Sequence, residues 1–190
     1  MRGDFARTLA GVVIAAVLAS CAPERTVGPP ADPRLDALFA QLQAAPDAAT
    51  AKIFEDQIWA TWTESGSPTI DILMERAQVA TASGDPELAR RYLDEATKLK
   101  PDFAEAWNRR AILAFDQEDY AAAVSDIQEA LKREPRHFGA LAGLGVIYEA
   151  MGQERAALEA YRDAVSVNPH LEQAKQGVAR LAPKLDGRET

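Results

Sequence analysis

Apolar and small side chains recur every 34 residues between positions 69 and 169 of the chain. Two columns of large apolar residues, two columns of alanine and one column of proline keep this spacing in register. The columns are Val79, Leu113 and Ile147; Leu93, Ile127 and Tyr161; Ala89, Ala123 and Ala157; Ala96, Ala130 and Ala164; and Pro101, Pro135 and Pro169. Five columns at one spacing indicate an internal repeat rather than a chance match.

Each repeat is predicted to form two antiparallel helices. The six helices are expected over residues 69–83, 86–99, 103–117, 119–133, 137–151 and 153–167. The repeated prolines end each second helix, because the residue before a proline disfavours the helical conformation. Small residues on the first helices, at Ala77, Ala111 and Gly145, allow close helix contact. Each pair has an apolar face that it cannot bury alone, so the pairs are expected to stack into a solenoid.

Residues 34–65 carry two further apolar stripes at helical spacing and predict a helix pair ahead of the repeats. The stripes consist of Leu35, Leu38, Phe39 and Leu42, and of Ile53, Phe54, Ile58 and Trp62. Asp47 is placed to cap the second helix. We expect this pair to cover the first end of the stack, with Trp59 and Trp62 in its core; a ligand-stacking platform is the alternative. A last helix within 170–182 is expected to cover the other end.

The third unit carries the fullest repeat signature, in which large, small and proline residues stand at fixed offsets. Its members are Leu141, Leu144, Gly145, Tyr148, Gly152, Ala157, Tyr161, Ala164 and Pro169. This pattern resembles the tetratricopeptide repeat (TPR), although Arg76 and Arg110 stand where leucine is usual. The resemblance implies an all-α TPR superhelical solenoid of antiparallel helix pairs within residues 34–182, with an N-terminal TPR-like pair and a C-terminal capping helix. Its repeats would span residues 69–101, 103–135 and 137–169.

The first 20 residues indicate an export signal. Arg2 and Arg7 precede an apolar run over residues 9–19, which is shorter than the ~20 apolar residues of a membrane-spanning helix. The sequence Leu-Ala-Ser-Cys that ends at Cys21 resembles the bacterial lipobox. The resemblance implies cleavage before Cys21 and attachment of a diacylglycerol to its thiol. An ordinary signal peptide, cleaved near Cys21 or Ala22, is the alternative and would give a soluble periplasmic protein.

Residues 21–33 contain four prolines and are predicted to form an extended tether. At ~3.1 Å per residue, such a segment would hold the helical region clear of a lipid surface. Alanine rather than aspartate follows Cys21, which in enterobacterial lipoproteins resembles export to the outer membrane. Ile58, Trp59 and Trp62 form an Ile-Trp-x-x-Trp sequence ahead of the repeats. With this sequence the chain resembles small TPR lipoproteins of the bacterial envelope, of the alphaproteobacterial type. This similarity implies a lipid-anchored place on the periplasmic face of the outer membrane, with the lipid membrane as a partner through Cys21.

Composition excludes several kinds of function. The 190-residue chain has a net charge of −8 and no basic stripe, so nucleic acid is not an expected partner. Its one cysteine excludes an intrachain disulfide. No nucleophile, base or metal set can be assembled, so neither an enzyme nor a cofactor site is predicted. His137 and His170 each lie just after a repeat-ending proline and are expected to begin helices; a metal pair is the alternative, but it lacks a third ligand.

In TPR stacks the first helix of each pair lines the concave face, and this resemblance predicts a binding groove. The predicted groove residues are Met74, Gln78, Glu105, Asn108, Arg109, Ile112, Phe115, Gly139, Ala142, Val146 and Glu149. Gly139 and Gly143 stand where clamps for acidic C-terminal tails carry basic residues, so an acidic tail is not the expected ligand. At these two glycines, close helix packing and the approach of a partner backbone both remain open.

The repeats and the export signal together predict a scaffold or adaptor that holds an envelope protein or peptide. The alternative is an accessory protein that binds a glycan or a small ligand in a peptidoglycan or envelope system.

Overall fold

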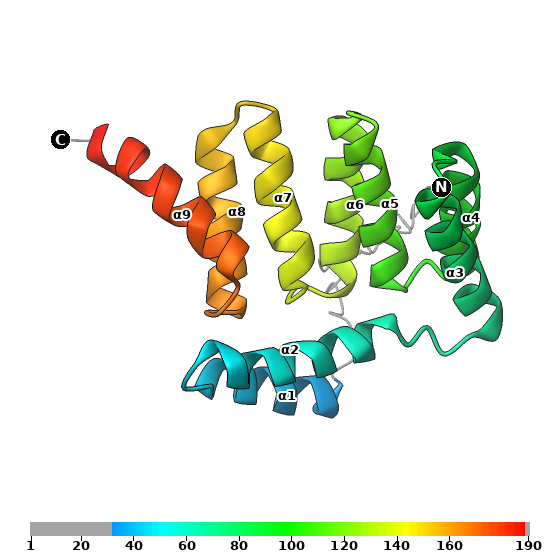
Figure 1. Cartoon of the computed structure of the whole chain (residues 1–190), viewed down its shortest axis with the longest axis horizontal. Helices are drawn as coiled ribbons and strands as arrows, with labels where there is room; N and C mark the ends of the chain where they lie inside the picture. Colours follow the sequence, from blue (N-terminus) through cyan, green and yellow to red (C-terminus); the bar gives the residue numbers. More distant parts are fainter. Residues whose placement is uncertain (1–31, 189–190) are drawn as a thin grey trace, which may run out of the picture.

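Helices form all of the regular structure in residues 32–188, which are the residues that the computed structural model describes (Figure 1). The elements are α1 (Pro33–Ala44), α2 (Ala48–Thr63), α3 (Pro68–Ala82), α4 (Pro86–Leu99), α5 (Ala104–Asp116), α6 (Tyr120–Arg133), α7 (Phe138–Ala150), α8 (Glu154–Val167), α9 (Glu172–Leu185) and the short 3-10 helix η1 (Asp186–Arg188). Among these helices, none is long and apolar enough to cross a membrane. The predicted signal peptide, Cys21 and nearly all of the predicted tether lie outside the described residues.

Aspartates begin four of the helices, because their side chains accept backbone N–H groups that have no partner within the helix. Asp47 accepts a hydrogen bond from the Thr50 N–H at 2.8 Å, and Asp85 accepts one from the Leu88 N–H at 3.0 Å. The first helical residue of α1, α3 and α4 is a proline, whose missing N–H has no intrahelical partner to lose. The predicted cap at Asp47 is confirmed.

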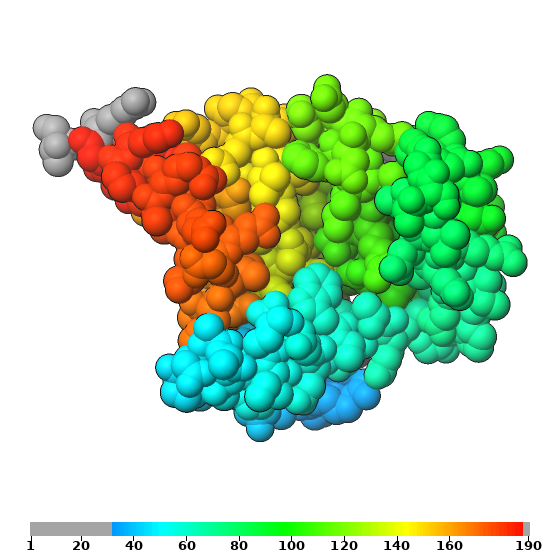
Figure 2. Space-filling view, viewed as in Figure 1, coloured from blue at the N-terminus to red at the C-terminus, as the bar shows by residue number. Residues whose placement is uncertain are grey.

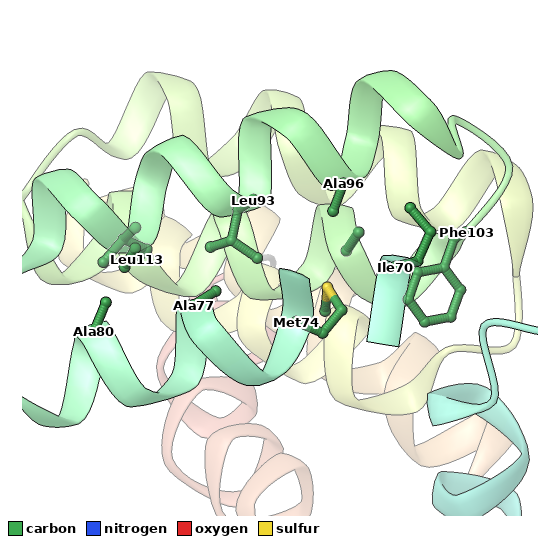
Figure 3. Packing of buried hydrophobic residues seen from close by; sticks show 10 residues of the cluster. Ile70, Met74, Ala77, Ala80, Leu93, Ala96, Phe103 and Leu113 are labelled. Atoms are coloured by element: carbon green, nitrogen blue, oxygen red, sulfur yellow. The ribbon is translucent and has the colours of Figure 1, made fainter. Parts of the chain in front are cut away.

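Three antiparallel pairs, α3–α4, α5–α6 and α7–α8, correspond to the three predicted repeats (Figure 1). Each observed helix end lies within one residue of the predicted end, which confirms the repeat register. The repeated alanines are closed to solvent, with 0% exposure at Ala89, Ala123 and Ala157. Figure 3 shows the core of the first repeat, where Met74 of α3 and Leu93 of α4 belong to one buried cluster.

Glycine at position 145 lets α7 approach α8 closely. A Cβ atom on Gly145 would lie 2.5 Å from the ring of Tyr161, which is closer than real Cβ contacts. Gly177 of α9 approaches the opposite edge of the same ring. The close contact predicted for Gly145 is therefore confirmed. Helix α9 is the predicted capping helix, and it extends to Leu185, beyond the predicted end at residue 182.

The N-terminal hairpin α1–α2 lies across one edge of the repeats instead of stacking before α3. Figures 1 and 2 show it (blue to cyan) along the lower border of the repeat helices. Gln43 of α1 donates hydrogen bonds to the Ser166 and Val167 carbonyls at the end of α8, both at 2.8 Å. Arg136, ahead of α7, pairs with Asp36 at 2.7 Å. The prediction that this pair covers the first end of the stack is wrong, because its polar contacts with the repeats are with the third repeat, and α2 also lies against α5 of the second repeat.

A core of its own holds the hairpin in this position. Phe138, which begins α7 and is fully buried, packs edge-on against Phe39 of α1 and at a tilt against Trp62 of α2, with ring centroids 6.5 Å and 4.9 Å away. Val167 and Leu171, at the junction of α8 and α9, pack against this cluster. Burying an aromatic side chain of this size stabilises a fold by about 1.5–3 kcal/mol. The apolar stripes of residues 34–65 are therefore buried, but against the third repeat rather than the first.

A candidate binding groove on the first-helix face

The first helices of the three repeats form a face with two adjoining pockets. One pocket, of about 310 Å³, lies between α5 and α7 and is bordered by Trp59 of α2 and Gln173 of α9. The other, of about 290 Å³, lies between α3 and α5 and is lined by Gln78 and Thr81 of α3. Ile112 belongs to both pockets and is 53% exposed. Because they share this residue, we treat the two pockets as one surface, the α5 groove.

The lining of the α5 groove is mostly apolar. Its apolar residues are Trp59, Ala77, Ala82, Leu93, Ala111, Ile112, Leu113, Phe115, Ile127, Val146 and Ile147. Among the lining residues in the described range 32–188, Arg109 is the one cation and Asp116 the one anion. Such a surface favours burial of apolar ligand side chains over recognition of charge.

Seven of the predicted groove residues line the α5 groove. They are Gln78, Asn108, Arg109, Ile112, Phe115, Gly139 and Val146. Sequence reasoning missed Trp59 and Gln173, because neither lies on a first helix and both reach the groove through tertiary packing. Trp62 is a core residue with 8% exposure, as predicted, whereas Trp59 is half-buried and contributes to the groove.

Four predicted groove residues lie elsewhere. Met74, Glu105 and Ala142 are buried within the helix stack, with exposures of 8%, 4% and 2%. Glu149 forms an ion pair with Arg180 of α9 at 2.6 Å and does not line either pocket. Successive residues of a helix are turned by about 100°, so residues at the border of the groove face are buried in the stack. Repeat position alone does not separate these border residues from the residues that line the groove.

Glu105 is a buried carboxylate beside the α5 groove. It accepts hydrogen bonds from Asn108 at 2.9 Å, from Arg109 at 2.8 Å and from Nε2 of His137 at 3.3 Å. Burial acts to raise the pKa of Glu105, but the hydrogen bonds from His137 and Arg109 outweigh burial and leave the pKa below its usual value. The carboxylate is therefore ionised at neutral pH, and it ties α5 to the start of α7.

His137 fixes the first turn of α7. Its Nδ1 accepts the backbone N–H of Ala140 at 3.1 Å, so the proton of the neutral ring is on Nε2, next to Glu105. The ring is fully buried and stacks on Trp62, with centroids 4.1 Å apart and planes at 11°. The predicted helix-start role of His137 is confirmed. Within residues 32–188, no three or more His, Cys, Asp and Glu side chains are grouped so that they could hold a metal ion.

Gly139 and Gly143 differ in their surroundings. A Cβ atom on Gly139 would lie 2.7 Å from the Trp59 ring, so glycine is needed there for the packing of α2 on α7. A Cβ atom on Gly143 would meet only the Ile127 side chain, at 3.9 Å, and Gly143 lines the groove. Close packing within the chain thus accounts for Gly139, whereas Gly143 leaves open space at the groove.

Three stacked helix pairs with a groove on their first helices define a helical-repeat binding scaffold. A family model described as Tetratricopeptide repeat matches residues 74–126 and 108–172. A TPR repeat-containing protein of Rhizobium etli is 41% identical over 157 residues, which cover 83% of this chain and 77% of that protein. The chain therefore belongs to the tetratricopeptide repeat family, whose members mediate protein–protein interactions.

Solved structures share this fold. The first TPR of Spaghetti, bound to the HSP90 peptide SRMEEVD, has a TM-score of 0.60 and 18% identity, and the match covers 63% of this chain and 95% of that chain. The crystal structure of MamA protein has a TM-score of 0.56 and 22% identity, and covers 81% of each chain. At these identities the similarity establishes the fold alone.

Proposed function

We propose that this protein is a lipid-anchored adaptor that holds an envelope protein at the periplasmic face of the outer membrane. The observation that carries the binding role is the α5 groove, an apolar surface on the face formed by α3, α5 and α7. The proposed location rests on the lipobox-like sequence that ends at Cys21. The peptide-bound Spaghetti domain, which has a similar fold, supports a peptide segment as the ligand.

The groove fits a segment with apolar side chains better than an acidic tail. The peptide in the Spaghetti structure, SRMEEVD, carries three acidic side chains near its end. Here Arg109 is the one cation among the lining residues, and its guanidinium already donates to Glu105. Ile112, by contrast, is exposed between two apolar pockets. We therefore expect an extended segment or a helix that places apolar side chains on either side of Ile112.

Replacement of Ile112 by aspartate tests the groove, because a carboxylate there would lose its hydration when a ligand covers it. Ile53 of α2 is a matched control, since it is 56% exposed and outside the groove. After cross-linking in cells, tagged full-length chains are captured and the attached envelope proteins are identified by mass spectrometry. Ile112→Asp should reduce specific capture about tenfold, equivalent to ~1.4 kcal/mol, while Ile53→Asp should not. Equal capture by both variants and wild type would exclude the groove as the binding surface.

The membrane anchor is tested separately with Cys21→Ala. This variant should lose globomycin-sensitive processing and leave the membrane fraction, because no thiol remains to receive the lipid. Retention of the variant in the membrane would show that Cys21 is not the anchor. That result would leave the groove experiment unaffected, so location and binding can fail independently.

A further inference from the structure

Helix α3 presents an apolar stripe at the start of the repeat array. Ile72 is 50% exposed and Val79 is 59% exposed, and the charged residues Glu75 and Arg76 are exposed between them. Half-buried side chains of α4 extend this surface, and together they border a shallow depression of about 560 Å³. We call the four residues of α3 the α3 end face. Ile72 and Val79 lie two turns apart on the helix, about 10 Å along its axis.

The repeat register shows what this stripe does in the later repeats. The positions that correspond to Ile72 and Val79 are buried there. In the second repeat they are Ala106 and Leu113, with 0% and 5% exposure. In the third repeat they are Ala140 and Ile147, with 0% and 2% exposure. The second-repeat pair belongs to a core shared with α3 and α4, and the third-repeat pair to a core shared with α5 and α6. The stripe is therefore a stacking contact with the preceding helix pair. Within residues 32–188 no helix pair precedes α3 in the stack, since the α1–α2 hairpin packs against the start of α7 and the junction of α8 and α9.

The charges on the stripe also lack the partners that the next repeat has. Arg110, which corresponds to Arg76, donates to both oxygens of Asp126 at 2.8 Å and 2.7 Å and to Asp94 of the preceding pair at 3.0 Å. Tyr92 occupies the Asp126 position in the first repeat, and the Arg76 guanidinium lies 5.9 Å from the centre of its ring. Within residues 32–188, neither Arg76 nor Glu75 forms an ion pair. The α3 end face thus offers one cation and one anion side by side between two aliphatic residues.

We propose that the α3 end face binds a second copy of this chain, with the two α3 helices antiparallel about a two-fold axis between Glu75 and Arg76. The stripe has the same order of residue types in both directions about that point: aliphatic, charged, charged, aliphatic. An antiparallel copy therefore places Ile72 against Val79 of the second copy, and Glu75 against Arg76 of the second copy. Each contact occurs twice, as in an isologous interface. The aliphatic contacts supply most of the affinity, and the two ion pairs fix the register.

The other end of the array favours this closed arrangement over head-to-tail stacking. The third repeat is covered by α9, whose exposed side carries Glu172, Lys175, Arg180 and Lys184. A second copy that placed its Ile72 and Val79 there would bury aliphatic side chains against charged ones, which is unfavourable. A two-fold contact between two α3 end faces buries aliphatic side chains against aliphatic side chains, and it gives a closed dimer.

Charge exchange at the axis tests the proposal with the full-length chain. Two copies with different C-terminal tags are co-expressed and solubilised in detergent, and one tag is captured while the other is quantified. Wild-type copies should be captured together. Glu75→Arg alone and Arg76→Glu alone should each reduce joint capture about tenfold, because like charges then face each other twice. A Glu75→Arg copy expressed with an Arg76→Glu copy should restore it, since every cation then faces an anion.

Glu159→Arg is the control, because Glu159 is an exposed glutamate of α8 far along the chain from the stripe. It should leave joint capture at the wild-type level. Restoration by the mixed pair also shows that both variants are folded. Absence of joint capture for wild type would overturn the proposal, and so would single variants that associate normally. A mixed pair that stays apart would mean that another protein, or the segment before residue 32, covers the face instead.

Discussion

Replacement of Glu105 by glutamine tests the charge that the structure assigns to this buried side chain. Three donors converge on the carboxylate, from Asn108, Arg109 and His137. An amide keeps one acceptor oxygen, but its NH2 group then faces at least one of these donors. Loss of the charge-assisted hydrogen bonds should lower the free energy of unfolding by about 2–3 kcal/mol near neutral pH. For a chain of this size the melting temperature should fall by roughly 5–10 °C.

The effect of Glu105→Gln should depend on pH in a defined direction. The pKa of Glu105 in the folded protein is below its ordinary value of 4.5, because the hydrogen bonds from His137 and Arg109 outweigh burial. Its ionisation therefore stabilises the fold above pH 4.5, and this contribution is lost as the pH falls through the folded-state pKa. The difference between wild type and variant should be full near neutral pH and should shrink in acid. Urea unfolding curves at several pH values measure this difference directly.

Glu159→Gln gives the matched control, since it removes a carboxylate that is exposed on α8. It should change the free energy of unfolding by less than about 0.5 kcal/mol. Two outcomes would refute the reasoning: a cost for Glu105→Gln as small as that of the control, or a cost that stays the same well below pH 4.5. Either would mean that the carboxyl group is not ionised in the folded protein, or that its hydrogen bonds are not the ones seen here.

Two further substitutions test the packing. Gly145→Ala should cost about 1–3 kcal/mol in unfolding free energy, because its Cβ would lie 2.5 Å from the Tyr161 ring. Gly143→Ala is the control and should cost nothing, because the nearest neighbour of its Cβ would be 3.9 Å away. Equal urea midpoints for the two variants would contradict the close contact at Gly145. Phe138→Ala should cost about 3–5 kcal/mol and should speed amide hydrogen exchange in α1 and α2 before α3 and α4. Unchanged protection of the hairpin would contradict its placement on the third repeat.

The six repeat helices, α3 to α8, could be predicted to within one residue because the signals that set their ends are local. Asp85 and the proline after it begin α4 through their own backbone chemistry, whatever the rest of the chain does. The repeat adds tertiary information, since a position that is buried in one unit, such as Ala123, is buried at Ala157 in the next. The repeated spacing therefore predicts that the helix pairs stack in the order of the chain.

The position of the hairpin could not be predicted in this way, because its partner is distant in sequence. The stripe that contains Phe39 shows an apolar face but not what covers it. Its partner Phe138 stands about 100 residues later and belongs to no repeated column. The place of Trp59 in the groove could not be predicted for the same reason, because Trp59 borders the groove only through the position of the hairpin. Met74 is the opposite case: it lies on a first helix, but its side chain packs in the core with α4 and does not reach the groove.

One structural cause thus shapes both proposed surfaces. The hairpin on the third repeat brings Trp59 to the α5 groove, and among residues 32–188 it leaves Ile72 and Val79 without the preceding helix pair that later repeats have. A hairpin stacked before α3 would cover the stripe and remove one border of the groove. The two surfaces nevertheless share no residue, so they should respond to different changes. Phe138→Ala, which loosens the hairpin, should weaken ligand capture and leave association between copies intact, whereas Glu75→Arg should do the reverse.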